Sequence, residues 1–533
     1  MADIQILGVV GAGAMGRGIA QIAAQAGIKV RLYDNNAAAV AAARDALAQT
    51  WDKLAQKGKM SAEAVKAALD HIQPAQALAD LADCQLVVEA IVERLDVKRD
   101  LFSQLESIVG PDCILASNTS SLSITAIAAA CQRPGRVAGF HFFNPVPLMK
   151  VVEVIDGLRS APAVGDALAA LARRMGHTPV RAKDMPGFIV NHAGRGMNTE
   201  GLRAAQEAVA PFDQIDAIMR EQAGFRMGPF ELMDLTGLDV SHPVMESIYG
   251  QFFDEPRFRP SPITTVRLAG GLLGRKAGEG FYVYQDGQKQ VPAERSAGWP
   301  TARCRSTAAP AIWPSTRSSA FTATAVPALP QGLRVWVSAA HADGQARAQA
   351  LLRQLGAEVV QADAAPADAL LVVTPLGEDV SSCVAGQGLD GTRTVGLDVL
   401  HDFAASRRRT VMTSPATTAR WRDAAHALFA KDGVAVSVIE DSPGFIAQRV
   451  VATIVNIACD IAQQHIATPG DIDQAVNLGL GYPKGPLAMG DALGAARILE
   501  ILRNMERVTG DPRYRPSLWL QRRVQLGLPL AQA

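Results

Sequence analysis

The chain has 533 residues, of which 48% are apolar and 20% are charged. This length corresponds to three or four domains of about 150 residues each, and the composition excludes a chain that stays disordered. Lys and Arg together number 52, as do Asp and Glu, so no overall charge attracts the protein to nucleic acid or to an anionic membrane. We expect a multidomain globular protein that binds neither.

Cysteine use and the N-terminus indicate the compartment. The six cysteines have no metal-ligand spacing and are too sparse for a disulfide framework. Asp3 and Gln5 stand where a signal peptide needs basic residues, and no apolar run is long enough to span a membrane. These features predict a cytoplasmic protein without a metal site.

Residues 1–183 alternate short apolar runs with helical segments, the pattern of parallel strands joined by crossover helices. The expected strands are Ile4–Val10, Val30–Tyr33, Leu86–Ala90, Ile114–Ala116, Val137–Phe140 and Val151–Ile155. Beyond Asp184 the β-branched runs end, and helical patterns such as Val190–Ala208 and Phe212–Gln222 begin. We predict an α/β Rossmann-type domain over 1–183 and an all-α domain over 184–290.

The second half of the chain repeats the first. Asp184-Met-Pro-Gly-Phe188 recurs as Asp441-Ser-Pro-Gly-Phe445, and Asp234 recurs as Asp491, each 257 residues later. The constant offset predicts a second helical domain over 438–533. Before it, the strand-like runs are Leu333–Ser338, Glu358–Ala362, Leu370–Thr374 and Val395–Val399. They predict a shortened, degenerate α/β domain over 332–437, so that both halves are duplicated.

Residues 291–331 separate the two halves. They are rich in Ala, Ser, Thr, Pro and Arg without an apolar period, which is typical of a linker. Because residues 302–325 suit neither a linker nor a core, a local change of reading frame in the gene is the alternative. Resequencing that finds the frame intact would exclude it.

A glycine-rich loop, Gly11-Ala-Gly13-Ala-Met-Gly16, lies between an apolar strand and a helical pattern, the context of a dinucleotide-binding loop. Gly11 allows the tight turn, Gly13 lets backbone N–H groups approach a pyrophosphate, and Gly16 lets the helix pack on the strand. Asp34 ends the next strand, where a carboxylate can bind the adenosine ribose and repel a 2′-phosphate. The loop predicts NAD rather than NADP, against the alternative of a glycine-rich turn without a nucleotide. The matching segment 339–344 lacks these glycines and is not expected to bind a dinucleotide.

Six further motifs follow in chain order: SNTSS at 117–121, GFHFFNPVP at 139–147, VVEV at 151–154, DMPGFIVN at 184–191, GPFEL at 228–232 and GEGFY at 278–282. Together they resemble the L-3-hydroxyacyl-CoA dehydrogenase family over residues 1 to about 285. The duplicated tail resembles the long bacterial members, including 3-hydroxyadipyl-CoA dehydrogenases of phenylacetate degradation and long 3-hydroxybutyryl-CoA dehydrogenases. The resemblance implies an NAD-dependent oxidoreductase of fatty acid metabolism that acts on an acyl-CoA.

His141 is the candidate acid/base. Oxidation of a secondary alcohol needs a base for the hydroxyl proton, and histidine titrates nearest neutral pH. His141 follows a predicted strand at the carboxyl edge of the sheet, and Glu153 on the next strand can fix its tautomer and stabilise the imidazolium. The resemblance implies the same pairing, while a structural histidine is the alternative reading.

Other site residues are assigned by resemblance. It places Ser120 and Asn191 at the substrate's 3-oxygen and nearby carbonyl, where donors can stabilise developing charge. Taken alone, these would be a turn serine and a helix-capping asparagine. The resemblance also places Glu93, Lys98 and Lys276 around the nicotinamide half of NAD, whereas Glu93 and Lys98 taken alone form a charged loop after a strand.

A basic cluster follows the second strand. Thr50, Lys53, Lys57 and Lys59 lie close together in sequence, and Lys53 and Lys57 share a helix face. A solvated charged face is one interpretation. The resemblance implies that Thr50 and Lys57 bind coenzyme A and that Asn144 contacts the substrate.

The second half does not carry the same catalytic set. Gln448 replaces Asn191, Asp398 stands where His141 would be, and the equivalent of Glu153 is expected near Thr413. We predict one active site per chain, with the second helical domain packed on the first as a covalent substitute for a dimer partner. A homodimer of two chains is the alternative to this pseudo-dimer within one chain.

The sequence thus predicts interconversion of an (S)-3-hydroxyacyl-CoA and its 3-oxoacyl-CoA, with 3-hydroxyadipyl-CoA or 3-hydroxybutyryl-CoA as candidate substrates. One alternative is a related dehydrogenase of a secondary alcohol without coenzyme A, such as a polyol or sugar acid. The other is a nucleotide-binding module without catalytic activity.

Overall fold

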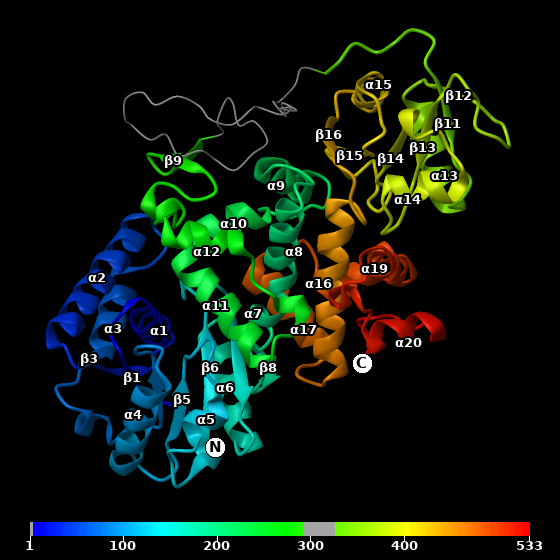
Figure 1. Ribbon diagram of the computed structural model, residues 1–533. Coiled ribbons are helices and arrows are strands. Elements are labelled where there is room, and N and C mark those ends of the chain that lie inside the picture. The colour runs from blue at the N-terminus through cyan, green and yellow to red at the C-terminus, as the bar shows by residue number, and fades with distance from the viewer. Residues whose placement is uncertain (1–3, 291–325) are drawn as a thin grey trace, which may run out of the picture.

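A computed structural model describes residues 4–290 and 326–533. Figure 1 shows two α/β parts, one in blue and cyan and one in yellow, with helices between them. In this helical middle, α8 (Arg195–Gln206) and α16 (Ile446–Gln463) lie side by side. The two halves of the chain therefore meet largely through helices, and no strand of one described sheet pairs with a strand of the other.

The first α/β part contains an eight-stranded sheet with the order β3-β2-β1-β4-β5-β6-β7-β8. The strands are β1 (Ile6–Val10), β2 (Lys29–Tyr33), β3 (Ile72–Pro74), β4 (Leu86–Glu89), β5 (Ile114–Ser117), β6 (Val137–Phe142), β7 (Val151–Asp156) and β8 (Thr178–Lys183). All neighbouring pairs are parallel except β6 with β7. The Rossmann-type fold predicted from the sequence is confirmed, and β3 and β8 are strands that the sequence pattern did not reveal.

Helices cover both faces of this sheet. They are α1 (Ala14–Gln25), α2 (Ala37–Gln56), α3 (Ala62–His71), α4 (Leu95–Ile108), α5 (Ile124–Ala128) and α6 (Pro162–Arg174), with short 3₁₀ turns at Leu78–Leu81 and Pro134–Arg136. Because successive strand side chains point to opposite faces, Leu86 and Val88 pack into one core and Val87 into the other. The strands are hydrophobic on both faces, as a covered parallel sheet requires.

The first helical part follows β8. Its elements are α7 (Val190–Ala193), α8, α9 (Phe212–Glu221), α10 (Pro229–Thr236), α11 (Leu238–Gln251), α12 (Pro262–Ala269), 3₁₀ turns at Pro256–Phe258 and Arg275–Ala277, and the hairpin β9 (Val283–Gln285) and β10 (Gln288–Gln290). The predicted helix Val190–Ala208 is two helices, because the chain breaks at Gly194 between α7 and α8.

The second α/β part is shorter. Its sheet has the order β12-β11-β13-β14-β15-β16, with β14 and β15 antiparallel. The elements are β11 (Arg334–Val337), α13 (Ala342–Gln354), β12 (Glu358–Val359), β13 (Leu370–Val373), α14 (Val380–Gln387), a 3₁₀ turn at Gly391–Arg393, β14 (Thr394–Leu397), β15 (Arg408–Thr413), α15 (Ala419–Phe429) and β16 (Ala435–Ile439). Within residues 326–533, nothing corresponds to the run from α2 to α4 of the first half. The predicted degenerate second half is confirmed.

The second helical part contains α16, α17 (Pro469–Leu480), α18 (Pro486–Leu493), α19 (Ala495–Thr509), a 3₁₀ turn at Pro512–Tyr514 and α20 (Leu518–Leu526). Its repeated aspartates make repeated contacts. Asp184 accepts hydrogen bonds from the backbone N–H groups that open α5, and Asp441 does the same for α14. Asp234 accepts from Phe281 and Tyr282, and Asp491 accepts from the backbone of residues 530 and 531, although no GEGFY motif is present there. The sequence repeat is therefore a structural repeat.

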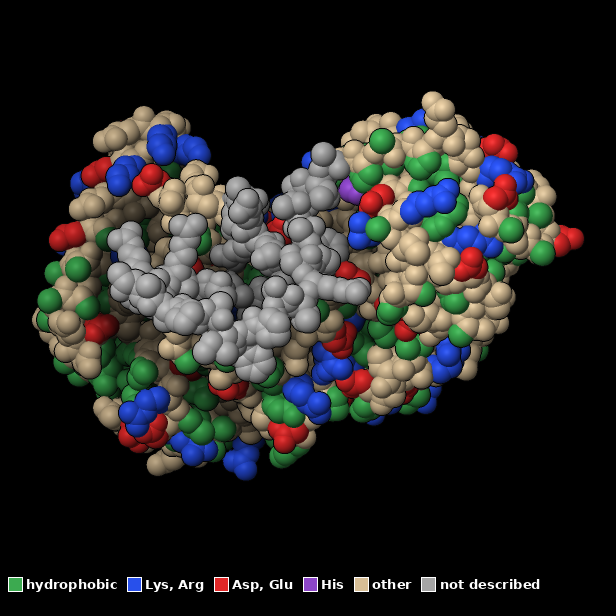
Figure 2. Space-filling model, turned by 45° about the horizontal axis from the view of Figure 1, so that its top comes forward, with side chains coloured by type: hydrophobic (Ala, Val, Ile, Leu, Met, Phe, Trp, Pro, Cys, Tyr) green, Lys and Arg blue, Asp and Glu red, His purple; other side chains and the backbone are tan. Residues whose placement is uncertain are grey.

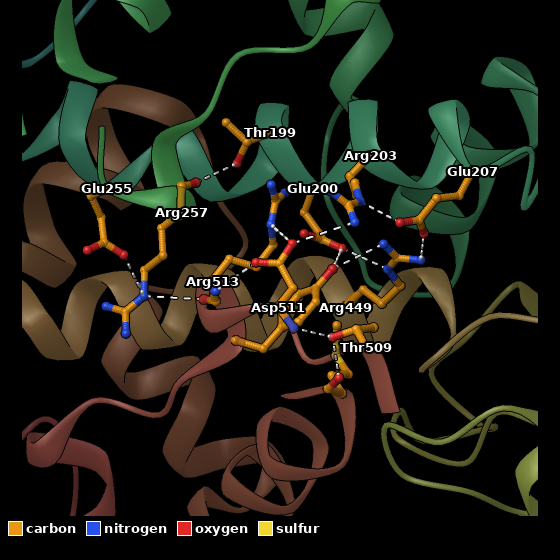
Figure 3. Close-up of polar contacts among 12 residues, drawn as sticks. Thr199, Glu200, Arg203, Glu207, Glu255, Arg257, Arg449, Thr509, Asp511 and Arg513 are labelled. Atoms are coloured by element: carbon orange, nitrogen blue, oxygen red, sulfur yellow. Dashed lines mark hydrogen bonds and ion pairs between the residues drawn. The ribbon is translucent and has the colours of Figure 1, made fainter. Parts of the chain in front are cut away.

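A buried ion pair joins the two helical parts (Figure 3). Arg449 on α16 donates to Glu200 of α8 and to Glu207, the residue after α8, each at 2.7 Å, and Tyr514 donates to Glu200 at 2.9 Å. Arg449 and Glu200 are each 1% exposed. Burial alone would lower the pKa of Arg449, but Tyr514, Glu200 and Glu207 outweigh it and hold that pKa well above its ordinary value.

The helices approach closely beside this pair. A Cβ added at Gly196 on α8 would lie 3.1 Å from the backbone of Ile454 on α16. Nearby, Arg257 pairs with Asp460 and donates to the carbonyl oxygens of Arg513 and Arg515. The packing of one helical copy on the other within the chain, which the sequence predicted, is observed.

Several predictions concern the chain as a whole. Of the predicted linker 291–331, residues 291–325 lie outside the described residues. The segment 302–325, for which a changed reading frame is the alternative, is among them. The five described cysteines are buried and free. Among the described helices, none is long and apolar enough to cross a bilayer. Figure 2 shows positive and negative side chains intermingled over the visible face.

Candidate active site

The loop predicted to bind NAD connects β1 to α1. Gly11 has φ +106°, and a Cβ there would lie 2.5 Å from the carbonyl oxygen of Ala90. A Cβ at Gly16 would clash with the carbonyl oxygen of Gly11. Around Gly13 nothing lies within 4 Å of an added Cβ, and no side chain caps the first turn of α1. The loop is thus tightly packed at Gly11 and Gly16 and open at Gly13, the residue before α1. A pyrophosphate can reach the N-terminus of α1 from this open side.

Asp34 follows β2 beside this loop. Its Oδ2 accepts a hydrogen bond from Ala12 N at 2.8 Å, and its Oδ1 accepts one from Asn36 N at 2.9 Å. The carboxylate is therefore fixed against the loop that carries Gly11 and Gly13. This is the position from which an acid can bind the adenosine ribose.

His141 and Glu153 are direct cross-strand neighbours on β6 and β7. His141 Nδ1 lies 2.6 Å from Glu153 Oε2, and the two residues are 4% and 0% exposed. Nδ1 therefore carries the proton that bonds the carboxylate, which leaves Nε2 as the atom able to accept a proton. Among the described residues, none lies within hydrogen-bonding distance of Nε2.

The second oxygen of Glu153 organises the start of the helical part. Glu153 Oε1 accepts hydrogen bonds from Ile189 N at 2.9 Å and Val190 N at 2.8 Å. These follow the turn at Gly187 and Phe188, which have φ +76° and +49°. The Pro-Gly-Phe turn thus directs two backbone donors at the carboxylate. These donors could not be predicted from residue types, because they are backbone groups.

Ser120 and Asn191 lie next to each other in the structure. Asn191 Nδ2 donates to the backbone oxygen of Ser120 at 3.4 Å, and α7, which carries Asn191, begins where Glu153 holds it. The Ser120 hydroxyl lies 3.4 Å from Glu93 Oε1. The Ser120 hydroxyl and the Asn191 amide, from two different parts of the chain, therefore lie near each other. Asn191 closely follows the turn at Phe188, whose ring packs against that of His141.

Glu93 and Lys98 belong to a larger polar cluster. Glu93 accepts from Thr119 and from the backbone of Ser120, and its Oε2 lies 3.2 Å from Lys98 Nζ. Burial would raise the pKa of Glu93, but Lys98 and these hydrogen bonds lower it.

Lys98 also pairs with Glu89 at 2.5 Å, and both side chains are buried. Ser117 donates to the other oxygen of Glu89 at 2.6 Å. Sequence analysis missed Glu89, although its position as the last residue of β4, at the carboxyl edge of the sheet, was a usable signal.

The remaining candidates lie elsewhere on the surface of the first half. The Thr50 hydroxyl donates to Ala46 O within α2, and Lys57 follows the end of that helix. Asn144 precedes the cis peptide bond to Pro145, just past β6. Lys276 forms an ion pair with Asp239 of the first helical part at 2.5 Å. Within the described part of the chain, it does not contact the cluster of Glu93 and Lys98. The catalytic candidates His141, Glu153, Ser120 and Asn191 therefore lie together. The residues predicted to contact the cofactor or coenzyme A are more widely spread.

The equivalent position in the second half is filled by a closed polar cluster. Asp398 follows β14, and its carboxylate accepts from Gln448 at 2.9 Å and from Gln222 of the first helical part at 2.6 Å. The residue opposite Asp398 on β15 is Thr410 and not Thr413, since Asp398 N donates to Thr410 O and Thr410 donates to Gln222. The expectation near Thr413 was wrong by three residues, and the constant offset of 257 leads from Glu153 to Thr410.

Sequence and structure comparisons agree over the chain. The sequence model of the 3-hydroxyacyl-CoA dehydrogenase NAD-binding domain matches residues 6–185, and that of the C-terminal domain matches twice, at 187–284 and 444–531. The chain is 37% identical over 527 residues to the 3-hydroxyadipyl-CoA dehydrogenase of Escherichia coli K12, covering 99% of this chain and 98% of the relative.

Shorter and solved relatives show the same similarity. A probable 3-hydroxybutyryl-CoA dehydrogenase of Deinococcus radiodurans is 44% identical over 277 residues, 52% of this chain and 99% of its own length. The crystal structure of 3-hydroxybutyryl-CoA dehydrogenase from Escherichia coli K12 superposes with a TM-score of 0.80 at 34% identity, over 98% of this chain and 99% of that one.

Proposed function

The chain belongs to the 3-hydroxyacyl-CoA dehydrogenase family, and from this premise we propose how its own residues interconvert an (S)-3-hydroxyacyl-CoA and a 3-oxoacyl-CoA with NAD. The observation that carries the proposal is the buried His141–Glu153 pair, whose Nδ1–Oε2 distance is 2.6 Å. It lies at the carboxyl edge of the sheet that bears the glycine loop, where open α/β folds bind ligands.

Proton transfer is the task of His141. Its Nε2 takes the proton of the 3-hydroxyl group, and the resulting imidazolium is stabilised by the carboxylate of Glu153, whose other oxygen accepts two backbone N–H groups. Bound NAD supplies the acceptor for the hydride that leaves C3. In the reverse direction, His141 returns the proton to the oxygen of the ketone.

Ser120 and Asn191 position the reacting oxygen. Their hydroxyl and amide can donate to an oxygen that gains negative charge during ketone reduction, and such donors are each worth roughly 2–4 kcal/mol. Glu93 and Lys98 border the nicotinamide half of NAD in this proposal, while Lys276 is a more distant contact. Thr50, Lys57 and Asn144 hold the acyl-CoA.

Asp34 is the proposed determinant of NAD over NADP. Substituting Asp34→Ser is expected to weaken NAD binding by roughly 10- to 100-fold, because hydrogen bonds to a charged group are lost, and to reduce the preference against NADP. Fluorescence titration with NADH and NADPH measures both effects. Asp45→Ser, an exposed acid on α2, is the matched control. Unchanged affinity for both cofactors would remove Asp34 from this role.

The test of the function is the fall in absorbance at 340 nm when the protein is mixed with NADH and acetoacetyl-CoA. Turnover of acetoacetyl-CoA without turnover of free acetoacetate supports the coenzyme A-dependent reaction. Turnover of a free polyol or sugar acid instead would favour a dehydrogenase of another secondary alcohol. NADH binding without turnover of any of these would indicate a nucleotide-binding module.

Assembly and compartment belong to the same proposal. The contact between α8 and α16 supports a pseudo-dimer within one chain, and buried free cysteines support a reducing cytoplasm. The domain limits at 183, 290, 331 and 437 are likewise proposed.

A further inference from the structure

Helix α17 of the second helical part lies against the elements that hold the first active site. It packs on α7, β7 and β8, and Figure 1 shows it beside α7 and β8. The backbone N–H of Lys183, the last residue of β8, also donates to the carbonyl oxygen of Ile466, shortly before α17, at 2.8 Å. The second half of the chain therefore contacts both the strand that carries Glu153 and the helix that carries Asn191.

Gly479 is the residue of α17 at this contact. A Cβ added to it would lie 3.1 Å from Cγ2 and 3.2 Å from Cγ1 of Val190, and 3.4 Å from Cγ1 of Val151. These distances are shorter than the 3.5–4.0 Å or so at which carbon atoms pack best, so even one added methyl group displaces a neighbour. Val151 lies two residues before Glu153 and therefore on the same face of β7. The glycine thus lets α17 approach α7 and β7 closely.

Helix α7 is too short to hold its own position. It has four residues, and helices of this length are not stable without tertiary contacts. At its start, Val190 contacts α17 through its side chain, and its backbone N–H donates to Glu153 Oε1 at 2.8 Å. At its end, a Cβ added to Gly194 would lie 3.0 Å from Cδ1 of Leu480 on α17. Contacts at both ends of α7 therefore fix Asn191 and the N–H group that bonds Glu153.

The repeat provides a comparison within the chain. By the offset of 257 residues, Gly479 corresponds to Gln222, and Val190 corresponds to Ala447. A valine accompanies the glycine, whereas an alanine accompanies the glutamine. An exchange of large and small side chains is the pattern expected of two positions that share one space in a closely packed interior.

Gln222 shows what a long side chain does at this position. Its Nε2 donates to Asp398 at 2.6 Å, and its Oε1 accepts a hydrogen bond from Thr410 at 2.5 Å. Asp398 and Thr410 are the residues that the offset relates to His141 and Glu153. In the second α/β part, a side chain from the other half therefore occupies the positions of the catalytic pair. The glycine keeps the first site free of such a side chain.

We propose that Gly479 is a positioning residue of the first active site. Through its contact with Val190 it fixes α7, and with α7 the places of Asn191 and of the backbone donor to Glu153. The inference rests on the proposed function, because it is there that Asn191 acts on the 3-oxygen and Glu153 acts on His141. The second helical part then contributes to the rate of the reaction as well as to packing.

The test enlarges the side chain at position 479 and follows the reduction of acetoacetyl-CoA. In Gly479→Val, the branched side chain is expected to displace α7 and to lower kcat by on the order of 10- to 100-fold, because a shift of about 1 Å at a reacting group costs this much. Gly479→Ala should lower kcat less. The affinity for NADH, measured by fluorescence titration, should be unchanged, since the glycine loop follows β1, which pairs with β2 and β4.

Gly470→Val is the matched control. Gly470 lies exposed in the first turn of the same helix, and no atom of the described residues lies within 4 Å of a Cβ added there. The same substitution is therefore made without the contact, and kcat should be retained.

The double variant Gly479→Ala with Val190→Ala tests the path through α7. It removes the two methyl groups that the new Cβ would meet, and it keeps the backbone N–H group that donates to Glu153. We expect it to recover most of the kcat lost in Gly479→Ala, with Val190→Ala alone as the fourth member of the cycle.

The outcomes separate this inference from the proposed function. If the unmodified chain does not reduce acetoacetyl-CoA, the proposed function fails, and this inference with it. If the unmodified chain is active and Gly479→Val keeps the kcat of Gly470→Val, or loses only stability in urea while the folded fraction keeps its kcat, the positioning role alone is overturned. A double variant no faster than Gly479→Ala would overturn the path through Val190. Since Gly479→Ala adds a single methyl group, its comparison with the double variant decides the matter should Gly479→Val fail to fold.

Discussion

Replacing His141 by alanine is expected to slow the reduction of acetoacetyl-CoA by on the order of 10²- to 10⁴-fold, with NADH binding retained. The imidazole is the proposed proton donor and acceptor, whereas the glycine loop that would hold the cofactor lies on β1, which pairs with β2 and β4 and not with β6. The rate is read from absorbance at 340 nm and NADH binding from fluorescence titration.

The control for this substitution is His71→Ala, at the end of α3 and away from the site, which should keep full activity. Full activity in His141→Ala would refute the proposed mechanism. Should the alanine variant also lose NADH, His141→Asn, whose amide can still donate to Glu153, separates lost chemistry from lost structure.

Replacing Arg449 by methionine is expected to lower the free energy of unfolding by about 3–5 kcal/mol. The substitution leaves Glu200 buried with a single hydrogen bond, from Tyr514, and without its counter-ion. Equilibrium unfolding in urea measures the loss. The double variant with Glu200→Gln should recover part of it, because the uncompensated charge is then removed.

Arg94→Met is the matched control, since Arg94 pairs with Asp96 in solvent and such exposed pairs contribute at most about 1 kcal/mol. A loss in Arg449→Met no greater than in Arg94→Met would show that the interface does not depend on this pair. Activity measured on the still-folded fraction then tells whether the contact of α16 with α8 affects the site.

The Rossmann-type fold and the contact between His141 and Glu153 could be predicted because the sequence patterns that indicate them are local. The glycine loop sits between a strand and a helix, and His141 and Glu153 lie on adjacent strands whose antiparallel register brings them opposite each other. The aspartates of the repeat were found by a constant offset, and they bind equivalent backbone groups in both copies. The same offset would have found Thr410 had it been applied to Glu153.

What the sequence could not show depends on burial by distant residues. Lys98 resembles any charge near a helix start until α4 places it against Glu89 at the end of β4. Arg195 resembles a surface residue of an amphipathic helix, although it is only 7% exposed and forms no ion pair within the described residues. Hydrophobic periodicity reports which face of a helix is buried, but not which polar residue is buried without a counter-ion.

The ion pair between α8 and α16 has its arginine on α16 and its glutamate on α8, and the repeat does not provide the reverse pair. The residues related to Arg449 and Glu200 by the repeat are His192 and Ile457, so no second copy of this pair joins the two helical parts. In a symmetric dimer of identical subunits, each substitution at the axis appears twice and must suit both contacts at once. Once two copies share one polypeptide, each change is met by a single neighbour, so the halves can diverge independently.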